Sequence, residues 1–402
     1  MKNILFITGS SLATNPRLTK NYIYFSSKGY KCTVIAFIYG DWTDKLSQII
    51  IDKHHINCIL IPASRDQFIP WIKAGAMGKI SKLMYWLNPS PYWTAVASSK
   101  RVFQLLAELK KVDFPVDFIE GHTLAALYPS DYLSKKLDVP FLYDVEDYHP
   151  EEIIVDAGIK EKFRRFQLFK NHIPSASFVT AASPLIGKEV EKLLGWGPDR
   201  IVPINNSFFS NEFNIPQNIA AFGVVQFVWF SQKITFGRGL ELFIEAATFY
   251  RTKIELTLIG SLDFKFYNEL IEPNKDFIKV QAPLSQTDIH GRLNCFDIGL
   301  AIELTSVDFN KDICLSNKLF AYLQAGLFLF ATDTKGHINI LKDYPDAGLI
   351  NEQSMKDFSI GIGKLIESID SIRENRSFRF ENAKVFAYEK EVKKVELGIS
   401  KL

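Results

Sequence analysis

The sequence is poor in cysteine, since its 402 residues contain only four, far apart in the chain: Cys32, Cys58, Cys295 and Cys314. They form no Cys-x-x-Cys pair and no Cys/His pair at metal-binding spacing. This argues against a disulfide framework or a zinc site and favours a reducing, cytoplasmic compartment. No apolar run approaches the roughly 20 residues of a membrane span. The run Ile4–Ile7 is shorter than the core of a signal peptide, so we expect a buried first strand there.

An excess of charge of one sign is also lacking, because 47 Lys and Arg oppose 45 Asp and Glu for a formal charge of +2. A protein that binds nucleic acid mainly through phosphates carries a clearer basic excess, so we expect no nucleic-acid partner. The motifs G-x-G-x-x-G, Walker A, H-E-x-x-H and G-x-S-x-G are absent. Apolar residues are plentiful, at 47% with 33 Phe, and would fill the cores of two domains.

Short apolar runs alternate with helix-like stretches, the pattern of parallel sheets covered on both faces. In the first half we expect strands at 3–7, 33–37, 117–119, 140–143, 178–181 and 201–204, and helices at 17–27 and 124–136. In the second half we expect strands at 224–230, 254–259, 278–280, 298–302 and 327–331, and helices at 240–250 and 316–325. The polar segment 206–221 is the expected linker. The fold class is therefore α/β, with two doubly wound domains and ligands at the carboxyl ends of both sheets, in the cleft between them.

The loop after the first expected strand contains Gly9, Asn15 and Arg17. Gly9 would allow a ligand to approach the backbone, and Arg17 would open a helix at the cleft. An ordinary strand-to-helix turn with a surface arginine explains the same residues equally well, so spacing alone leaves both interpretations open.

The segment Ser231–Gly239 follows the first strand of the second series and leads into a helix. Lys233 and Arg238, five residues apart, bracket an expected flexible loop in this segment. A helix N-terminus already favours anions through its free N–H groups and its dipole. We interpret the two cations as neutralising a diphosphate there, with a solvated Lys/Arg pair as the alternative.

A third cluster lies between Asp312 and Gly326. Ser316 is expected to cap a helix, which puts Asn317 and Lys318 on its first turn. A lysine in that position opposes the helix dipole, a cost that a bound anion would relieve. The cluster therefore indicates function more than packing.

The run Asn-Lys-Leu-Phe-x-Tyr-Leu-x-Ala-Gly at 317–326 resembles the donor-binding helix of the retaining, nucleotide-sugar-dependent glycosyltransferases of family 4. The likeness extends along nearly the whole chain, more strongly in the second half. The other segments that carry it are Asn15–Arg17 with Lys28–Tyr30, Asp117–His122, Tyr143–Asp147, Lys233 with Arg238, Asn382–Lys384 and Tyr388–Glu391.

This resemblance implies the GT-B fold, in which two Rossmann-like domains face a cleft. Residues 1–205 would form the acceptor domain, 206–380 the nucleotide-sugar donor domain, and 381–402 a C-terminal helix that returns to the first domain. It also implies catalysis without a metal or a cofactor, with the UDP- or GDP-linked sugar as substrate.

The resemblance further assigns roles to residues. Three would be catalytic: His122 would line the sugar pocket, with a core or surface histidine as the alternative, and Lys233 and Arg238 would neutralise the leaving diphosphate. The donor would contact Ser231, Gly260, Ser316, Asn317 and Lys318, and the acceptor side would include Gly9, Asn15, Arg17, Glu146 and Asp147, with His149 nearby. A solvated loop explains Glu146 and Asp147 equally well.

One departure concerns two glutamates that the family carries eight positions apart, which contact the donor sugar and the ribose. Here those positions hold Ile313 and Ala321, whose side chains accept no hydrogen bond. Recognition of ribose and sugar must therefore use other groups or be weaker. Pro283 and Glu303 are candidates by position alone.

The segment Phe68–Val102 falls outside the sheet pattern and mixes three tryptophans with four lysines. This composition suits an interfacial segment that touches an anionic bilayer. A helical insertion that packs its aromatic side chains against the first domain is the alternative.

We therefore expect a cytoplasmic glycosyltransferase, in peripheral contact with the inner face of a membrane, that acts with retention on a glycan or a lipid-linked glycan in cell-surface polysaccharide synthesis. A non-catalytic scaffold of the same shape is the first rival, favoured by Ile313 and Ala321. A nucleotide-sugar epimerase of similar architecture is the second.

Overall fold

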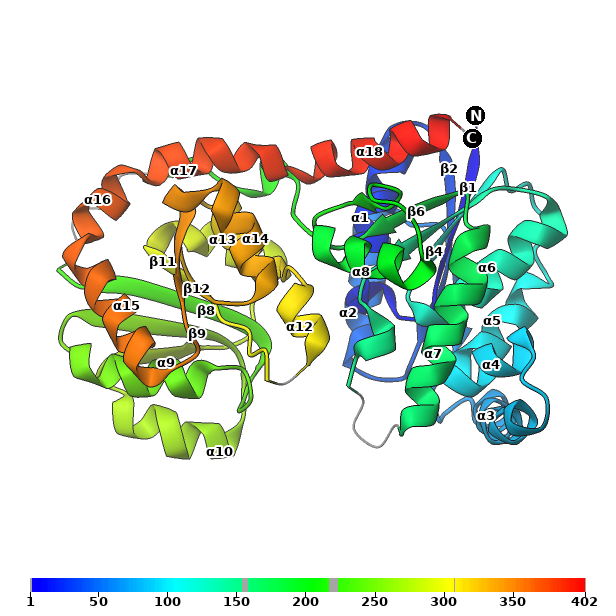
Figure 1. Cartoon of the computed structure of the whole chain (residues 1–402), viewed down its shortest axis with the longest axis horizontal. Helices are drawn as coiled ribbons and strands as arrows, with labels where there is room; N and C mark the ends of the chain where they lie inside the picture. The colour runs from blue at the N-terminus through cyan, green and yellow to red at the C-terminus, as the bar shows by residue number, and fades with distance from the viewer. Residues whose placement is uncertain (1, 154–157, 217–222, 307, 402) are drawn as a thin grey trace. The chain divides into compact units, whose positions relative to one another are not determined.

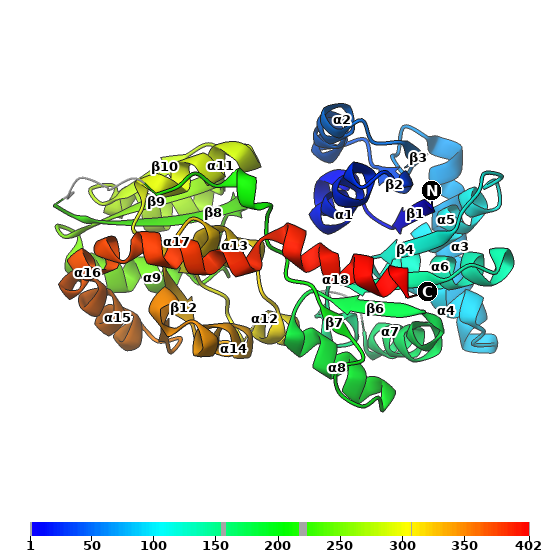
Figure 2. The ribbon, with the colours of Figure 1, turned by 90° about the horizontal axis from the view of Figure 1, so that it is seen from above.

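The computed structural model describes residues 2–153, 158–216, 223–306 and 308–401. They form two units, each a parallel β-sheet covered by helices (Figure 1, Figure 2). Unit 1 comprises Met1–Ile204 and Val392–Leu402, and unit 2 comprises Asn205–Glu391. The last helix, α18 (Tyr388–Ser400), begins in unit 2 and ends in unit 1. Within α18, the residues from Val392 onward belong to unit 1.

The sheet of unit 1 has seven strands in the order β3-β2-β1-β4-β5-β6-β7. Its strands are β1 (Asn3–Thr8), β2 (Lys31–Ile38), β3 (Cys58–Pro62), β4 (Phe118–His122), β5 (Phe141–Val145), β6 (Phe178–Ala181) and β7 (Val202–Pro203). Its helices are α1 (Pro16–Ser27), α2 (Trp42–His54), α3 (Phe68–Leu87), α4 (Pro91–Ser98), α5 (Arg101–Leu109), α6 (Leu124–Leu137), α7 (Ile159–His172) and α8 (Pro184–Leu194). Because β2 and β4 both pair with β1, every residue of β1 from Ile4 onward is buried.

The sheet of unit 2 has six strands in the order β10-β9-β8-β11-β12-β13. Its strands are β8 (Val225–Ile234), β9 (Ile254–Leu262), β10 (Ile278–Gln281), β11 (Ile298–Ala301), β12 (Phe328–Thr332) and β13 (Gly348–Asn351). Its helices are α9 (Leu240–Ala247), α10 (Phe264–Phe266), α11 (Gln286–Arg292), α12 (Phe309–Ile313), α13 (Asn317–Gln324), α14 (Lys335–Asp343), α15 (Met355–Glu367), α16 (Ile369–Glu374) and α17 (Arg376–Ala383).

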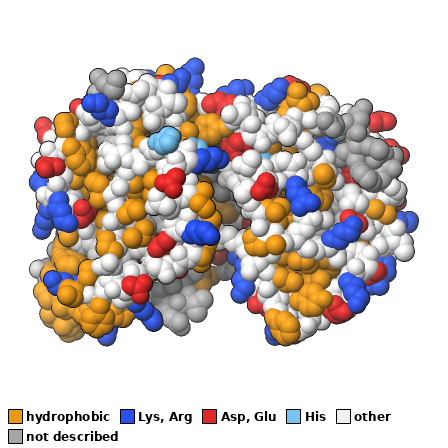
Figure 3. All heavy atoms as spheres, turned by 180° about the vertical axis from the view of Figure 1, so that it is seen from behind, with side chains coloured by type: hydrophobic (Ala, Val, Ile, Leu, Met, Phe, Trp, Pro, Cys, Tyr) orange, Lys and Arg blue, Asp and Glu red, His pale blue; other side chains and the backbone are white. Residues whose placement is uncertain are grey.

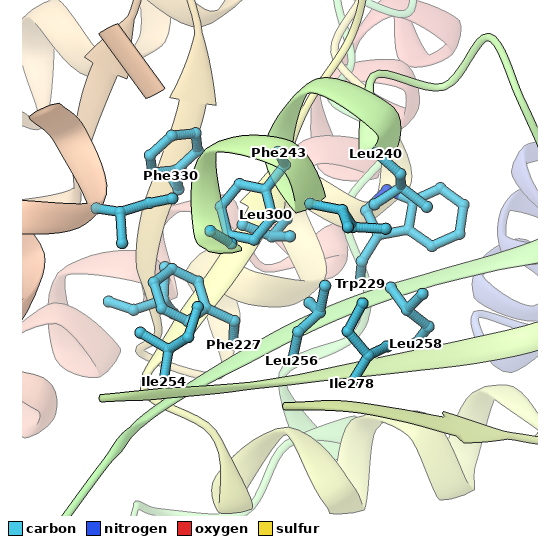
Figure 4. Packing of buried hydrophobic residues seen from close by; sticks show 14 of the residues in the cluster. Phe227, Trp229, Leu240, Phe243, Ile254, Leu256, Leu258, Ile278, Leu300 and Phe330 are labelled. Carbon is cyan, nitrogen blue, oxygen red and sulfur yellow. The ribbon is translucent and has the colours of Figure 1, made fainter. Parts of the chain in front are cut away.

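Alternate residues of the central strand β8 enter two different hydrophobic clusters of unit 2. Phe227 and Trp229 pack with Phe243 of α9 in one cluster (Figure 4). Val228 packs in the other cluster, with Leu319 of α13. Successive side chains of a strand point to opposite faces, so these clusters are the cores on the two faces of the sheet. Helix α13 therefore packs on one face of the sheet, against β11 and β12.

The two doubly wound, Rossmann-like parallel sheets of the GT-B class are confirmed, with differences in individual strands. The expected loop at 231–234 is wrong, because β8 continues through Ile234 with a bulge after Phe230. Strands β3 and β13 were not expected. Both are short edge strands that bury few side chains, and β3 ends in a proline, so their sequences lack the usual strand pattern.

Within the described ranges, none of the helices combines the length and the apolar character that crossing a bilayer requires.

Candidate functional site

Glu303 lies just beyond the carboxyl end of β11, and its backbone is fixed to the neighbouring strand β12. Its N–H donates to Thr332 Oγ1 at 3.0 Å, and that hydroxyl donates to the Glu303 carbonyl at 2.9 Å. The Glu303 side chain is only 10% exposed. A carboxylate this deeply buried needs partners, since an unpaired buried charge is costly.

Lys311 and Lys318 supply that partnership, and the charge of Arg238 acts on both of them; we call Arg238, Lys311 and Lys318, together with Glu303, the cation cluster. Lys311 Nζ lies 3.2 Å from one Glu303 carboxylate oxygen, and Lys318 Nζ lies 3.9 Å from the other. The cluster therefore carries a net positive charge, three cations against one carboxylate.

The pKa shifts of Glu303 and Lys318 reflect this excess of positive charge. Burial alone would raise the pKa of Glu303, but the charges of Lys318 and Lys311 outweigh it and lower that pKa. Burial lowers the pKa of Lys318, and the nearby charges of Lys311 and Arg238 lower it further, against the opposing effect of Glu303. Lys318 therefore gains from any additional anion that comes close to it.

Arg238 reaches the cluster because two glycines bracket it. Gly237 and Gly239 have φ of 76° and 79°, the left-handed region that a side chain rarely adopts. A Cβ on Gly239 would lie 2.3 Å from Ile302 Cγ2, so the turn packs directly on the segment that carries Glu303. The turn thus holds Arg238 at the carboxyl end of β11.

Two buried polar atoms near Lys318 have no hydrogen-bond partner among the described residues: Trp229 Nε1 and Ser316 Oγ. Lys318 Nζ lies 4.7 Å from the centroid of the Trp229 ring. Ser316 is the N-cap residue of α13, but its side chain makes no capping hydrogen bond, so the expected cap is wrong in that respect. Buried donors are normally paired. Unpartnered donors beside a cation and a helix N-terminus therefore fit an anion.

Lys233 has different surroundings from those we predicted. It lies inside β8, where it pairs with Ser261, and not in a loop. Its Nζ is 3.5 Å from Asp263 Oδ2, and its side chain is 58% exposed. Gly260 and Ser231 belong to the same strand pair, and a Cβ on Gly260 would lie 2.3 Å from the Ser231 carbonyl oxygen. Close packing of β8 on β9 therefore explains Gly260 by itself.

Ile313 and Ala321, at the positions where the family carries glutamates, are both buried, and Ala321 belongs to a hydrophobic cluster. His337 of α14 is also buried, and burial lowers its pKa, so the ring is neutral. Its Nδ1 donates to the Thr332 carbonyl at 2.9 Å, which leaves Nε2 as an acceptor without a partner in the part of the chain that is described. Glu303 and His337 thus both offer hydrogen-bond acceptors close enough to Lys318 to interact with its charge.

In unit 1, Arg17 forms a buried ion pair rather than a surface contact. Its Nε and Nη2 each donate to an oxygen of Asp144 at 2.7 Å, and its Nη1 donates to the Ile204 carbonyl at 2.7 Å. Thr180 adds a hydroxyl to Asp144 at 2.6 Å. The Arg17 charge holds the pKa of Asp144 well below its usual range, although burial alone would raise it. Arg17 therefore ties α1 to β5 and to Ile204, the residue after β7.

His122 continues this network and is fully buried. Its Nε2 lies 2.8 Å from Glu120 Oε1, and its Nδ1 lies 3.0 Å from Glu146 Oε1 and 3.4 Å from Asp144 Oδ2. Burial would lower the pKa of His122, but these carboxylates raise it well above its ordinary value. A protonated ring that donates from both nitrogens accounts for all three contacts. The structure therefore places His122 in a buried charge network.

Among the described residues, His122, Asp144 and Glu146 form a group that could hold a metal, with ligand atoms within 4.8 Å of one another. Both oxygens of Asp144 already accept from Arg17. A positive imidazolium also occupies the position that a cation would take. These side chains therefore fit a metal ion poorly.

The other predicted residues of unit 1 have local structural roles. Asn15 caps α1, accepting from Leu18 N at 3.1 Å, and a Cβ on Gly9 would lie 2.4 Å from Ala125 Cβ. Asp147 is half-buried, whereas Glu146 is 17% exposed and retains access to a ligand. His149 is paired with Glu152 at 2.9 Å.

No protein-family model matches the chain, and no curated protein matches it. Solved structures resemble it along its whole length. HepE from Anabaena in complex with UDP has 14% identity and a TM-score of 0.69, over 100% of both chains. A glycosyltransferase from Rickettsia africae has 14% identity and a TM-score of 0.64, over 99% of this chain and 97% of that one. UDP-GlcNAc 2-epimerase from Neisseria meningitidis has 10% identity and a TM-score of 0.58, over 100% of both. At such identities the likeness shows the fold.

Sequence reasoning missed Lys311 as a member of the site and identified Glu303 by position only. The available signal was a polar stretch, Glu303–Asp312, directly after a buried strand of the second sheet. It also missed Thr123, a β-branched residue with φ of 69° between β4 and α6, whose hydroxyl accepts from Gly9 N at 3.0 Å. Such a strained conformation is uncommon outside functional sites and tight turns.

Proposed function

We propose that the chain is a glycosyltransferase that moves a sugar, with retention and without a metal, from a nucleoside diphosphate sugar to a hydroxyl of a glycan or a lipid-linked glycan. The observation that carries this proposal is the cation cluster of unit 2, in which Lys311 and Lys318 pair with one buried carboxylate, the charge of Arg238 acts on both lysines, and unpartnered donors lie beside them. HepE, which has the same fold, occurs in solved structures with UDP and with UDP-glucose.

In this proposal the diphosphate lies against Lys318, Arg238 and the N-terminus of α13. When the sugar–oxygen bond breaks, negative charge builds on the leaving diphosphate. Fixed cations and backbone N–H groups stabilise that charge without reorganising. Lys318 contributes most to this stabilisation, because burial lowers its pKa in the free protein and the negative charge of an arriving phosphate raises it again. Asn317, on the same turn, adds a neutral donor close to the phosphate.

In this proposal Glu303 accepts hydrogen bonds from hydroxyls of the donor, in place of the two glutamates that are replaced by Ile313 and Ala321 in this chain. Glu303→Gln is expected to weaken UDP-glucose binding by about 10-fold or more, since hydrogen bonds to charged groups contribute roughly 1.5–3 kcal/mol. Binding of inorganic pyrophosphate should be unchanged or tighter, because the variant removes the one negative charge of the cluster. Isothermal titration with both ligands measures the two effects. Equal losses for both ligands would assign Glu303 a purely structural role.

The acceptor side of the proposal rests on unit 1. Glu146 is the residue of the buried network that retains some exposure, and it lies at the end of β5. The Arg17–Asp144–His122 network fixes its position through the imidazole of His122. We place this activity in cell-surface polysaccharide or glycoconjugate synthesis, in the cytoplasm and at the inner face of a membrane.

The proposal is tested by the thermal stability of the protein in the presence of UDP, GDP and their sugars. We expect one nucleotide to raise Tm in a concentration-dependent way, because a ligand that binds only the folded state stabilises it. If none of these nucleotides has an effect, the chain is a scaffold that shares the fold. If a donor sugar is epimerised when no acceptor is present, the chain is an epimerase.

A further inference from the structure

Helix α3 of unit 1 exposes an unusual number of large apolar side chains. Seven of them, which we call the α3 surface, are 44–71% exposed: Phe68, Ile69, Ile72, Ile80, Leu83, Trp86 and Leu87. At about 100° per residue they fall within an arc of roughly 120° on the helix. Hydrophobic side chains gather over this part of unit 1 in Figure 3, at the lower left. Contiguous apolar surface of this kind indicates a binding site.

The opposite side of α3 is fixed to the rest of unit 1. Ala74 and Ser81 are buried where α3 packs on α4. Tyr85 Oη donates to Gln167 Oε1 of α7 at 2.8 Å, and the Arg164 guanidinium lies 5.4 Å from the centroid of the Tyr85 ring. The α3 surface is therefore held facing outward, rather than packing its aromatic side chains against the domain. Trp86, at 71% exposed, shows this most clearly.

The charges around the α3 surface are of one sign. Lys73, Lys79 and Lys82 of α3 are all exposed, and no Asp or Glu occurs between Asp66 and Glu108. On the helix, Lys73 and Lys82 flank the apolar arc on its two sides, and Lys79 lies within it. A second copy docked through the same surface would bring lysines against lysines with no carboxylate to pair them. An anionic lipid surface satisfies both the apolar side chains and the lysines.

We propose that the α3 surface docks on an anionic lipid bilayer, with α3 lying in the plane of the interface. The apolar arc enters the boundary of the acyl chains, and the three lysines lie at the level of the phosphates. The idea that a lipid-linked acceptor lies in this membrane depends on the proposed function. The docking of the α3 surface on the bilayer does not depend on it.

The test measures binding of the full chain to vesicles without any nucleotide. We expect the protein to float with vesicles of phosphatidylglycerol and phosphatidylcholine in equal parts, and to bind pure phosphatidylcholine vesicles more weakly. Leu83→Glu combined with Trp86→Glu is expected to lower the partition coefficient about 10-fold or more, because it places carboxylates in the apolar arc. Both positions are exposed, so the variant retains its fold, which an unchanged Tm verifies.

Helix α2 offers a matched control, because it also exposes apolar side chains but carries carboxylates among them. Leu46 and Ile49 are 43% and 52% exposed, and Asp44 and Asp52 lie on the same helix. Leu46→Glu combined with Ile49→Glu should leave vesicle binding within about twofold of the unmodified protein. The proposal is overturned if the unmodified protein does not bind anionic vesicles, or if the two double variants lower binding equally. The proposal is also overturned if the only effect of the α3 variant is to dissociate an oligomer of the protein while vesicle binding is unchanged. Nucleotide binding is measured separately, so either proposal can fail alone.

Discussion

Replacing Asp144 with alanine is expected to lower the free energy of unfolding of unit 1 by about 3–5 kcal/mol, the usual cost of removing one partner from a buried ion pair. The variant leaves the Arg17 guanidinium, which is 4% exposed, without its carboxylate. It also removes one of the three carboxylates that stabilise the protonated ring of His122. Urea unfolding followed by tryptophan fluorescence measures the loss, because five of the six tryptophans belong to unit 1.

Lys111→Ala is the control for this prediction, since it also removes one partner of an ion pair in unit 1. Its partner is Glu108 at 2.7 Å, but the Lys111 side chain is 70% exposed. Exposed pairs contribute little, so we expect a change of about 0.5 kcal/mol or less. Equal effects of the two substitutions would show that the Asp144 network does not stabilise the fold.

The same network predicts how stability depends on pH. The pKa of Asp144 is lowered by folding, so its contribution is present above the ordinary aspartate pKa of about 3.9 and is lost as the pH falls below that value. The pKa of His122 is raised, so its contribution is present below about 6.5 and is lost as the pH rises through the folded value. Stability from the network is therefore greatest between these limits. Asp144→Ala should flatten the acid side of the profile.

The sequence was sufficient to predict what depends on local pattern. Alternating apolar runs predict most strands, and a lysine on the first turn of α13 indicates a nearby anion. Pairings between distant residues could not be predicted in this way. Arg17 and Asp144 lie 127 positions apart, and nothing in either neighbourhood shows that the arginine is buried.

Exposure was the second property that the sequence left open. The polar run after Phe230 indicated a loop, but these residues continue β8. Their side chains are largely exposed, and an exposed strand can be as polar as a loop, so polarity alone does not distinguish the two. Lys233 was assigned to the diphosphate for that reason. Conversely, the tryptophans and lysines of 68–102 fit both a packed insertion and an interfacial segment. The outward apolar arc of α3 favours the second.

Replacing Lys318 with methionine is expected to weaken UDP binding by about 100-fold, because truncating one side of a buried charge pair typically costs 2–5 kcal/mol. Methionine is apolar and nearly as long as the lysine whose ammonium lies 4.7 Å from the Trp229 ring centroid, so the fold should be preserved. Isothermal titration with UDP measures the loss. Lys233→Met is the matched control, since Lys233 belongs to the same unit but pairs with Asp263, and it should retain affinity within about twofold.

The dependence on pH distinguishes a direct role of Lys318 from a structural one. Because burial lowers the pKa of Lys318 in the free protein, part of its charge is lost as the pH rises through that lowered value. An incoming diphosphate restores the proton, so UDP binding should take up protons and weaken as the pH rises. Lys318→Met should abolish this slope, whereas Lys233→Met should leave it intact. If UDP affinity in Lys318→Met keeps the slope of the unmodified protein, another group carries the titration and the diphosphate does not contact Lys318.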